Sequence, residues 1–310
     1  MSVVVLGSAN VDVTINLERV PSPGETVLTD SSGRGAGGKG SNQAIAAARA
    51  GAPTQFIGAV GTDSDGDFML RTLSNAGVDV SLTRRVDAPT GTAYVMLERG
   101  GENAIVVVAG ANGELLELTG AEQEAIAAAD VLLMQLETPM PTVLQAAACA
   151  HAAGVKVVLN AAPFAQLPEQ LLKDIDLLNV NEHEAALALD VAGTADSGTP
   201  EQVARALAQR VSEVLITLGA DGSLYLASDG AAISTTAPRV KVIDTTGAGD
   251  TFIGAYCAAI VAGLDQVECL QFATSAAGLA VQSIGAATAI PAIGAIRAAM
   301  LPSVTFVTEP

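Results

Sequence analysis

The feature that most restricts the fold is a regular succession of short apolar segments and helical segments in the middle of the chain. Candidate strands lie at 131–136, 155–159, 177–180 and 214–217, and an alanine-rich helix is predicted over 140–153. Strands rich in Val and Leu are typical of a parallel sheet that is covered on both faces. This alternation predicts an α/β fold with a doubly wound, mainly parallel sheet, flanked by helices and joined by right-handed crossovers.

Polar residues follow the predicted strands at the same edge of the sheet. Asn10 and Asp12 follow the first apolar strand, at 2–6, while Glu137 and Asn181 follow later strands. Open α/β sheets bind ligands beyond the carboxyl ends of their strands, so Asn10 and Asp12 are candidates to bind a polyhydroxy compound. Solvated turns or helix caps are the alternative interpretation for individual members of the row.

Four segments with alternating apolar and polar residues predict half-exposed antiparallel strands outside the main sheet. Together they predict a small four-stranded β lid formed by about 12–33 and 92–109, with a turn at 99–103. A sheet of this size exposes one apolar face, which favours pairing with a second copy and hence a homodimer. The four segments are 13–18, 26–30, 92–98 and 104–108.

A glycine-rich stretch, 33–43, lies between the two halves of the lid. It fits the first part of a phosphate-binding P-loop up to Lys39, but Gly40 stands where that motif needs a Mg²⁺-binding hydroxyl. It also fits a dinucleotide-binding glycine pattern, but no buried strand precedes it. We interpret it as a flexible, glycine-lined approach to a ligand, with Lys39 and Asn42 as donors.

The segment 242–252 carries the strongest chemical signal. A β-branched run ending at Asp244 predicts a strand, followed by a tight turn through Gly247 and Gly249 and a helix that continues from Asp250. Backbone amides and the helix dipole at such a terminus attract an anion. A carboxylate placed there suits a base that takes a proton from a hydroxyl attacking a phosphate. The alternative is an ordinary turn with Asp250 near the N-cap.

The composition excludes several classes of function. The chain has 33 acidic and 15 Lys or Arg residues, a formal net charge of −18, no Trp and only 3% aromatic residues. This acidic surface repels nucleic acid and anionic membranes, and few aromatic rings are present to stack on bases. The same charge repels an anionic substrate such as a nucleotide. We therefore expect backbone amides, or a bound cation, beside any phosphate.

We expect a single domain, 1–310, in the cytoplasm. Three cysteines are an odd number, lack metal-ligand spacing and lie in apolar helical patterns, which favours buried, reduced thiols. No apolar run reaches the roughly 18 residues of a membrane span, and no basic region precedes the first apolar strand.

Taken in order, these motifs resemble the PfkB-type carbohydrate kinase family, also called the ribokinase family. The resemblance extends nearly from end to end, and the form Asp-Thr-Thr-Gly-Ala-Gly-Asp-Thr at 244–251 is specific to the family. It implies a ribokinase-like fold and ATP-dependent phosphorylation of D-ribose at the 5-hydroxyl group. The segments that carry it are 7–12, 37–44, 108–112, 134–137, 181–184, 216–219 and 244–251.

The resemblance also implies a role for individual residues. Asp250 would accept the proton, and the amides of Gly247, Ala248, Gly249 and Asp250 would form the anion hole. The sugar hydroxyls would contact Asn10, Asp12, Gly38, Lys39, Asn42, Glu137 and Asp250. The nucleotide would contact Asn181, Thr217, Gly219, Gly222, Gly249 and Thr274, with Glu184 acting on Mg²⁺ through its water shell. A K⁺ site would use Asp244, Thr246, Ala280, Ser283, Gly285 and Ala289, mostly through backbone carbonyls.

Two positions depart from the family pattern, and other functions stay open. Thr274 stands where a larger polar residue is expected beside adenine, and Ala289 where a hydroxyl is frequent beside K⁺. A related kinase for 2-deoxyribose, a ketose or a nucleoside is the main alternative, because side chains such as Asn10 and Asp12 do not by themselves exclude a close analogue. A dehydrogenase would need a glycine fingerprint after a buried strand. A sugar-binding regulator would need neither Asp250 nor the glycine-lined hole.

Overall fold

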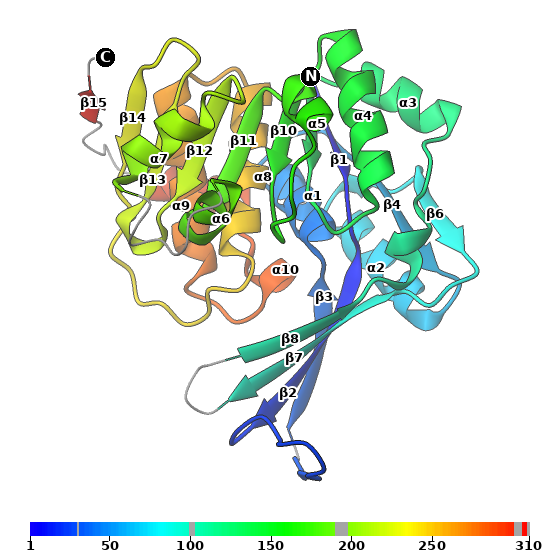
Figure 1. The fold of residues 1–310 in the computed structure, drawn as a ribbon. Coiled ribbons are helices and arrows are strands. Elements are labelled where there is room, and N and C mark those ends of the chain that lie inside the picture. Colours follow the sequence, from blue (N-terminus) through cyan, green and yellow to red (C-terminus); the bar gives the residue numbers. More distant parts are fainter. Residues whose placement is uncertain (30, 99–102, 190–197, 301–305, 309–310) are drawn as a thin grey trace.

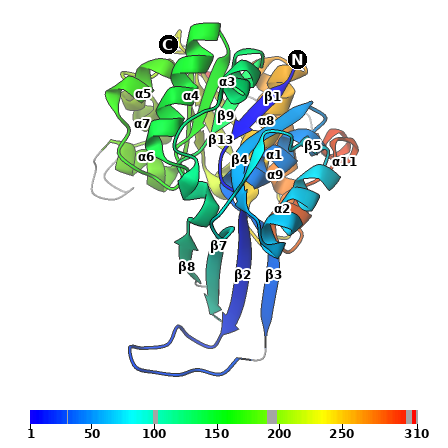
Figure 2. The same cartoon turned by 90° about the vertical axis from the view of Figure 1, so that its right-hand side faces the viewer.

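The computed structural model describes residues 1–29, 31–98, 103–189, 198–300 and 306–308. Within this part of the chain, a large α/β body carries a small four-stranded sheet that projects from one edge (Figures 1 and 2). None of the helices in the described ranges combines the length and the apolar character needed to span a membrane.

The body is built on one eleven-stranded sheet with the order β15-β14-β13-β12-β11-β10-β9-β1-β4-β5, and β6 pairs with β4. Strands β12 to β4 of this order are parallel, and β13, β14 and β15 add an antiparallel edge. The predicted doubly wound, mainly parallel sheet is therefore confirmed. The strands are β1 (Val3–Leu6), β4 (Thr54–Gly61), β5 (Val78–Asp79), β6 (Thr83–Val86), β9 (Val131–Met134), β10 (Lys156–Asn160), β11 (Leu177–Asn181), β12 (Glu213–Thr217), β13 (Ser223–Leu226), β14 (Ala232–Thr235) and β15 (Phe306–Thr308).

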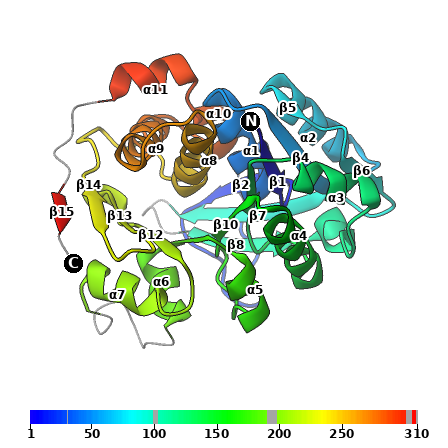
Figure 3. The same ribbon diagram turned by 90° about the horizontal axis from the view of Figure 1, so that it is seen from above.

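Helices cover both faces of this sheet and create two hydrophobic cores (Figure 3). Along β1, Val3 and Val5 belong to the core beneath α1, α8 and α9, while Val4 and Leu6 belong to the core on the α4 side. This division follows from the alternation of side chains along a strand. The helices are α1 (Lys39–Arg49), α2 (Ser64–Asn75), α3 (Gly120–Ala127), α4 (Met140–Ala153), α5 (Glu169–Asp174), α6 (Glu182–Ala188), α7 (Pro200–Leu207), α8 (Ala248–Val261), α9 (Gln266–Ala280), α10 (Ala286–Ala289) and α11 (Ile293–Ala299).

The small sheet has the order β3-β2-β7-β8 and forms the predicted lid. Its central pair, β2 and β7, is parallel, so the prediction of antiparallel strands throughout is wrong. Strands β2 and β7 are far apart in the sequence, so no short turn joins them. Their relative direction is therefore not restricted to the antiparallel arrangement of a hairpin. The predicted turn at 99–103 lies outside the described residues except for its last position. The lid strands are β2 (Asn10–Leu17), β3 (Ser32–Gly37), β7 (Gly91–Glu98) and β8 (Asn103–Val108).

The glycine-rich stretch is more ordered than its composition predicts. The second lid strand is β3, rather than 26–30, and α1 begins at Lys39, directly after the left-handed Gly38. A Cβ atom at Gly37 would lie 2.1 Å from Asp12 Oδ1. Glycine is needed here because a carboxylate packs against the strand, whereas a sequence pattern associates glycine with flexibility.

The predicted strand ending at Asp244 is absent, and its residues run along the surface. Val242 and Ile243 are more than half exposed, and the Ile243 amide donates to the Val281 carbonyl (2.8 Å). Short β-branched runs do not reveal whether a sheet edge is available to pair with them. The segment instead leads into α8 as an extended loop held by the end of α9.

Candidate active site

The N-terminus of α8 is open on the side where the sequence predicts an anion hole. Gly247 caps the helix with a φ of 72°, and a Cβ atom there would lie 3.0 Å from Ala286 Cβ. A Cβ atom at Gly249 would have no neighbour within 4 Å among the described residues. The Ala248 amide donates to the Thr245 carbonyl (3.2 Å), which closes the turn. The geometry leaves room for an anion in front of the first helical turn.

Asp250 does not cap α8. Its buried carboxylate, 8% exposed, accepts hydrogen bonds from Asn42 Nδ2 (3.0 Å) and Gln43 Nε2 (2.9 Å), both from α1. Burial raises the pKa of Asp250, and the Lys39 charge and the two amide donors oppose this rise. A carboxylate held this way is fixed in orientation and is a candidate general base.

Lys39 lies near three carboxylates. Burial disfavours its charge, but Asp250, Glu137 and Glu184 outweigh that effect and raise its pKa. The pKa of Asp12 is also raised, to about 6, because burial and then the charges of Glu137 and Asp250 disfavour its charged form. The predicted sugar-binding residues and the predicted base therefore share one electrostatic environment.

The other polar side chains on the sugar side are held by neighbours that the sequence analysis did not assign. Asn10 Oδ1 accepts from Asn112 Nδ2 (2.8 Å), and Asn112 Oδ1 accepts from the Ala9 amide (2.9 Å). Glu137 Oε2 accepts from Ser8 Oγ (2.5 Å) and from the Lys39 amide (3.1 Å). Asn112 and Ser8 lie in the family motifs at 108–112 and 7–12. Their place in these motifs was the only sequence signal that could have identified them as supporting residues.

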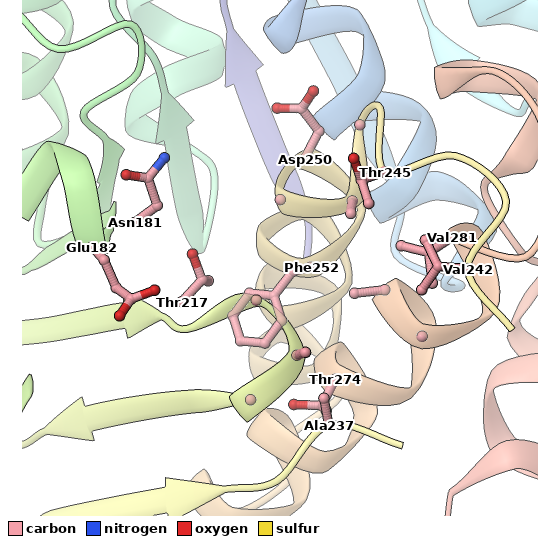
Figure 4. Close-up of a pocket in the computed structure, with 18 of the residues that line it drawn as sticks. Asn181, Glu182, Thr217, Ala237, Val242, Thr245, Asp250, Phe252, Thr274 and Val281 are labelled. Carbon is pink, nitrogen blue, oxygen red and sulfur yellow. The ribbon is translucent and has the colours of Figure 1, made fainter. Parts of the chain in front are cut away.

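A cavity of about 1080 Å³ extends from Lys39 and Asp250 to the antiparallel edge of the main sheet (Figure 4). Its volume is that of a site for a drug-sized molecule or a larger one. Side chains from the ends of β11 and β12 face those of α8 and α9 across it. All the residues predicted to contact the nucleotide or its Mg²⁺ line this cavity: Asn181, Glu184, Thr217, Gly219, Gly222, Gly249 and Thr274.

Asn181 and Glu184 also form a capping box at the start of α6. The Glu184 amide donates to Asn181 Oδ1 (2.8 Å), and the Asn181 amide donates to Glu184 Oε2 (2.9 Å). The capping interpretation of this motif is therefore correct, and its ligand-binding role stays a prediction. Burial raises the pKa of Glu184, which hydrogen bonding at Asn181 and the Lys39 charge partly offset.

The wall that α8 and α9 give to the cavity is largely apolar beyond Asp250. Phe252, Ala277 and Val281 line it from α8 and the end of α9. The Thr274 hydroxyl pairs with Thr235 Oγ1 (3.2 Å) at the cavity wall. A wall of this kind suits a flat aromatic group with few polar contacts.

The residues predicted to bind K⁺ lie on two segments that meet beside α8. Asp244 Oδ2 accepts from the Gly285 amide (2.8 Å), and its Oδ1 accepts from Thr246. Although burial opposes it, these hydrogen bonds lower the pKa of Asp244. Ala280 ends α9, Ser283 lies in the following turn and Ala289 ends α10. No group of three or more His, Cys, Asp or Glu side chains that could hold a metal ion occurs in the described ranges.

The family model for pfkB family carbohydrate kinases matches residues 1–293. The chain belongs to this family. The pfkB kinase described here is 39% identical to a ribokinase of Staphylococcus aureus over 293 residues, covering 93% of this chain and 96% of that protein. It is also 39% identical over 290 residues to a ribokinase of Haemophilus influenzae, covering 93% and 94%.

Solved structures agree with this assignment of the pfkB kinase. The structure of Arabidopsis thaliana ribokinase complexed with ribose and ATP is similar with a TM-score of 0.90 and 36% identity, covering 96% of this chain and 98% of that one. The ribokinase of Thermotoga maritima is similar with a TM-score of 0.87 and 31% identity, covering 96% and 98%.

Proposed function

We propose that this chain phosphorylates D-ribose at the 5-hydroxyl group with ATP, giving D-ribose 5-phosphate and ADP, and that 1–310 acts as one kinase domain with a β lid. The observation that carries the proposal is the buried Asp250 carboxylate at the start of α8, which lines the cavity and interacts electrostatically with Asp12. The ribokinases at 36–39% identity and the Arabidopsis complex with ribose and ATP support both substrates.

In the proposed step, Asp250 takes the proton of the 5-hydroxyl group as its oxygen attacks the γ-phosphorus. The new O–P bond forms while the bond between the γ-phosphorus and the β,γ-bridging oxygen breaks, and ADP leaves with that electron pair. The amides of the first turn of α8, from Gly247 to Asp250, and the Lys39 ammonium oppose the charge on the transferred group. Such a reaction depends more on position and charge than on covalent catalysis.

The sugar would bind to Asn10, Asp12, Gly38, Lys39, Asn42 and Glu137. Asn42 gives the clearest support, because its Oδ1 atom is buried and has no hydrogen-bond partner among the described residues. An unpaired buried amide oxygen costs about 1–3 kcal/mol, and a sugar hydroxyl would satisfy it. Asp12 and Glu137 supply acceptors for further hydroxyl groups.

The nucleotide would lie in the cavity, with its phosphates toward Asp250 and its base toward Thr274. Mg²⁺ would neutralise the phosphates, and Glu184 would hold it through water. Glu182 and Glu184 bring two carboxylates to this wall, and so small a set fits an ion that keeps most of its waters and binds mainly to the phosphates.

A monovalent cation would bind near Asp244 and Gly285. The surrounding donors are oxygens from a carboxylate, hydroxyls and backbone carbonyls, a set that suits K⁺. Ala289 offers only its carbonyl. We expect replacement of K⁺ by Na⁺ to lower turnover, measured as ADP release at constant ionic strength. Equal rates in the two salts would remove this site from the proposal.

The proposed cellular setting is the cytoplasm, since Cys257 and Cys269 are buried, unpaired thiols. The experiment that tests the function is ADP release by the purified protein with a panel of pentoses, hexoses and nucleosides. We expect D-ribose to give the highest kcat/KM. A higher value for 2-deoxyribose, a ketose or a nucleoside would assign the chain to the corresponding kinase.

A further inference from the structure

A chain of buried amide side chains extends from Asp250 into the main sheet. Gln43, in α1, is 0% exposed and donates through Nε2 to both Asp250 Oδ1 (2.9 Å) and Asn160 Oδ1 (2.9 Å). Its Oε1 accepts from Gln135 Nε2 (2.7 Å), directly after β9. The two hydrogens of the Gln43 amide group are thus both used, one of them on the candidate base.

The sheet fixes the orientation of the Gln43 amide. Gln135 occupies its oxygen, so its nitrogen must face Asp250. Asn160, at the end of β10, is itself held by a hydrogen bond from its Nδ2 to Asn179 Oδ1 (3.2 Å) on β11. Asn179 Nδ2 donates in turn to the Leu215 carbonyl (3.1 Å) on β12. Three parallel strands therefore support a single donor to Asp250.

We propose that Gln43 is a positioning residue for phosphoryl transfer, which holds the Asp250 carboxylate in its reactive orientation. This inference rests on the proposed function of Asp250. Asn42 donates to the same carboxylate but also lies among the predicted sugar contacts, so the substrate competes for its side chain. Gln43 does not line the cavity and its polar atoms are all paired, so its contact persists whether or not the substrates are bound.

The hydrogen bond from Gln43 to Asp250 also affects the charge state of Asp250. Asp250 faces the Lys39 ammonium and the carboxyl groups of Glu137, Asp12 and Glu184. A hydrogen bond from Gln43 stabilises the charged carboxylate, which is the form that accepts a proton. Without this bond, burial and the neighbouring carboxylates hold Asp250 protonated up to a higher pH.

The test compares Gln43→Met with the wild-type enzyme, on the best acceptor of the panel. Met fills a similar volume without a donor. We expect kcat to fall by about tenfold or more, KM for the sugar to change by less than about threefold, and the acid limb of the kcat profile to move up by about one pH unit. An unchanged acid limb and an unchanged kcat in the folded variant would overturn the proposal, as would a loss confined to KM.

Thr142→Val is the matched control for loss of a buried polar contact. Thr142 is also 0% exposed and donates to the Leu115 carbonyl, in the core on the opposite face of the sheet from α8. We expect its melting temperature to fall while its acid limb stays at the wild-type pH. An equal shift of the limb in this control would show that destabilisation alone moves it, and would overturn the assignment.

If Gln43→Met does not fold, Gln43→Glu tests the positioning role of Gln43 instead. It keeps the shape and the acceptor for Gln135 but places a second carboxyl group against Asp250, so the acid limb should move up at least as far as in Gln43→Met. A wild-type limb in Gln43→Glu would contradict the proposal. Wild-type turnover of ribose, measured first, tests the proposed function separately.

Discussion

Asp250 combines burial with two amide donors, and this combination determines what its replacement should do. Asp250→Asn keeps the size of the side chain but removes the proton acceptor. We expect kcat to fall by about 10²–10⁴-fold, with the Kd for ribose within a few-fold of wild type. ADP release and calorimetric ribose binding measure the two quantities. Nearly full turnover in the variant would exclude Asp250 as the base.

The buried position of Asp12 leads to a second prediction, which concerns stability and its dependence on pH. Its pKa of about 6 lies above the usual aspartate pKa of 3.8, since burial and then Glu137 and Asp250 disfavour its charge. Between these values the folded protein binds more protons than the unfolded chain, so this group lowers stability as the pH rises from about 4 to 6. The loss of folding stability from Asp12 reaches its full size above about pH 6 and is absent below about pH 4.

Asp12→Asn should therefore stabilise the protein without sugar at pH 7.5 by about 1–3 kcal/mol, and the gain should vanish near pH 4. Ribose affinity should fall in the same variant. Urea unfolding at both pH values measures the first effect. Glu117→Gln, which removes one exposed charge, is the control. A gain of equal size at pH 4, or in the control, would contradict the electrostatic explanation.

At the scale of elements, the sequence predicted the helices and strands whose positions depend on local residue patterns. The bounds of α4 agree at both ends with the predicted 140–153. The lid was predicted, but β3 was misplaced because the pairing of its glycines with β2 is a tertiary effect. The open helix start at Gly247 and the position of Asp250 were predictable from spacing. The partners Gln43 and Asn112 were not, since hydrogen bonds between distant segments leave no local signal.

Strand β3 offers a matched pair of substitutions. A Cβ atom at Gly37 would lie 2.1 Å from Asp12 Oδ1, whereas one at Gly35 has no neighbour within 4 Å among the described residues. Gly37→Ala should displace the Asp12 carboxylate and raise KM for ribose by about tenfold or more, while Gly35→Ala should stay within about twofold of wild type. Similar kinetics for the two variants would contradict the placement of Asp12 in the sugar site.

At the scale of the whole molecule, the outer strand of the lid exposes an apolar surface. Ile105, Val106, Val107 and Val108 on β8 are each about half exposed, from 50% to 54%. An unprotected edge strand of β-branched residues promotes association, and a second copy of the lid would cover it. We propose a homodimer through β8 on this basis.

Replacement of Val107 by Lys should separate such a dimer without unfolding the body, because the strand lies outside both hydrophobic cores. Sedimentation velocity should give two protomers for the wild type and one for Val107→Lys. A wild-type monomer at micromolar concentration, or an unchanged dimer in the variant, would contradict the proposed interface.

The chain passes from β1 to β2 within three residues, Gly7 to Ala9, and so connects the body with the lid immediately before Asn10. Asn10 and Asp12 belong to the first lid strand, so any displacement of the lid would carry them with it. In the proposed function, that displacement would separate the proposed sugar contacts on the lid from those on the body, such as Lys39 and Asp250. The residues that line the cavity proposed for the nucleotide all lie outside the four lid strands, so the same displacement would leave that cavity in place.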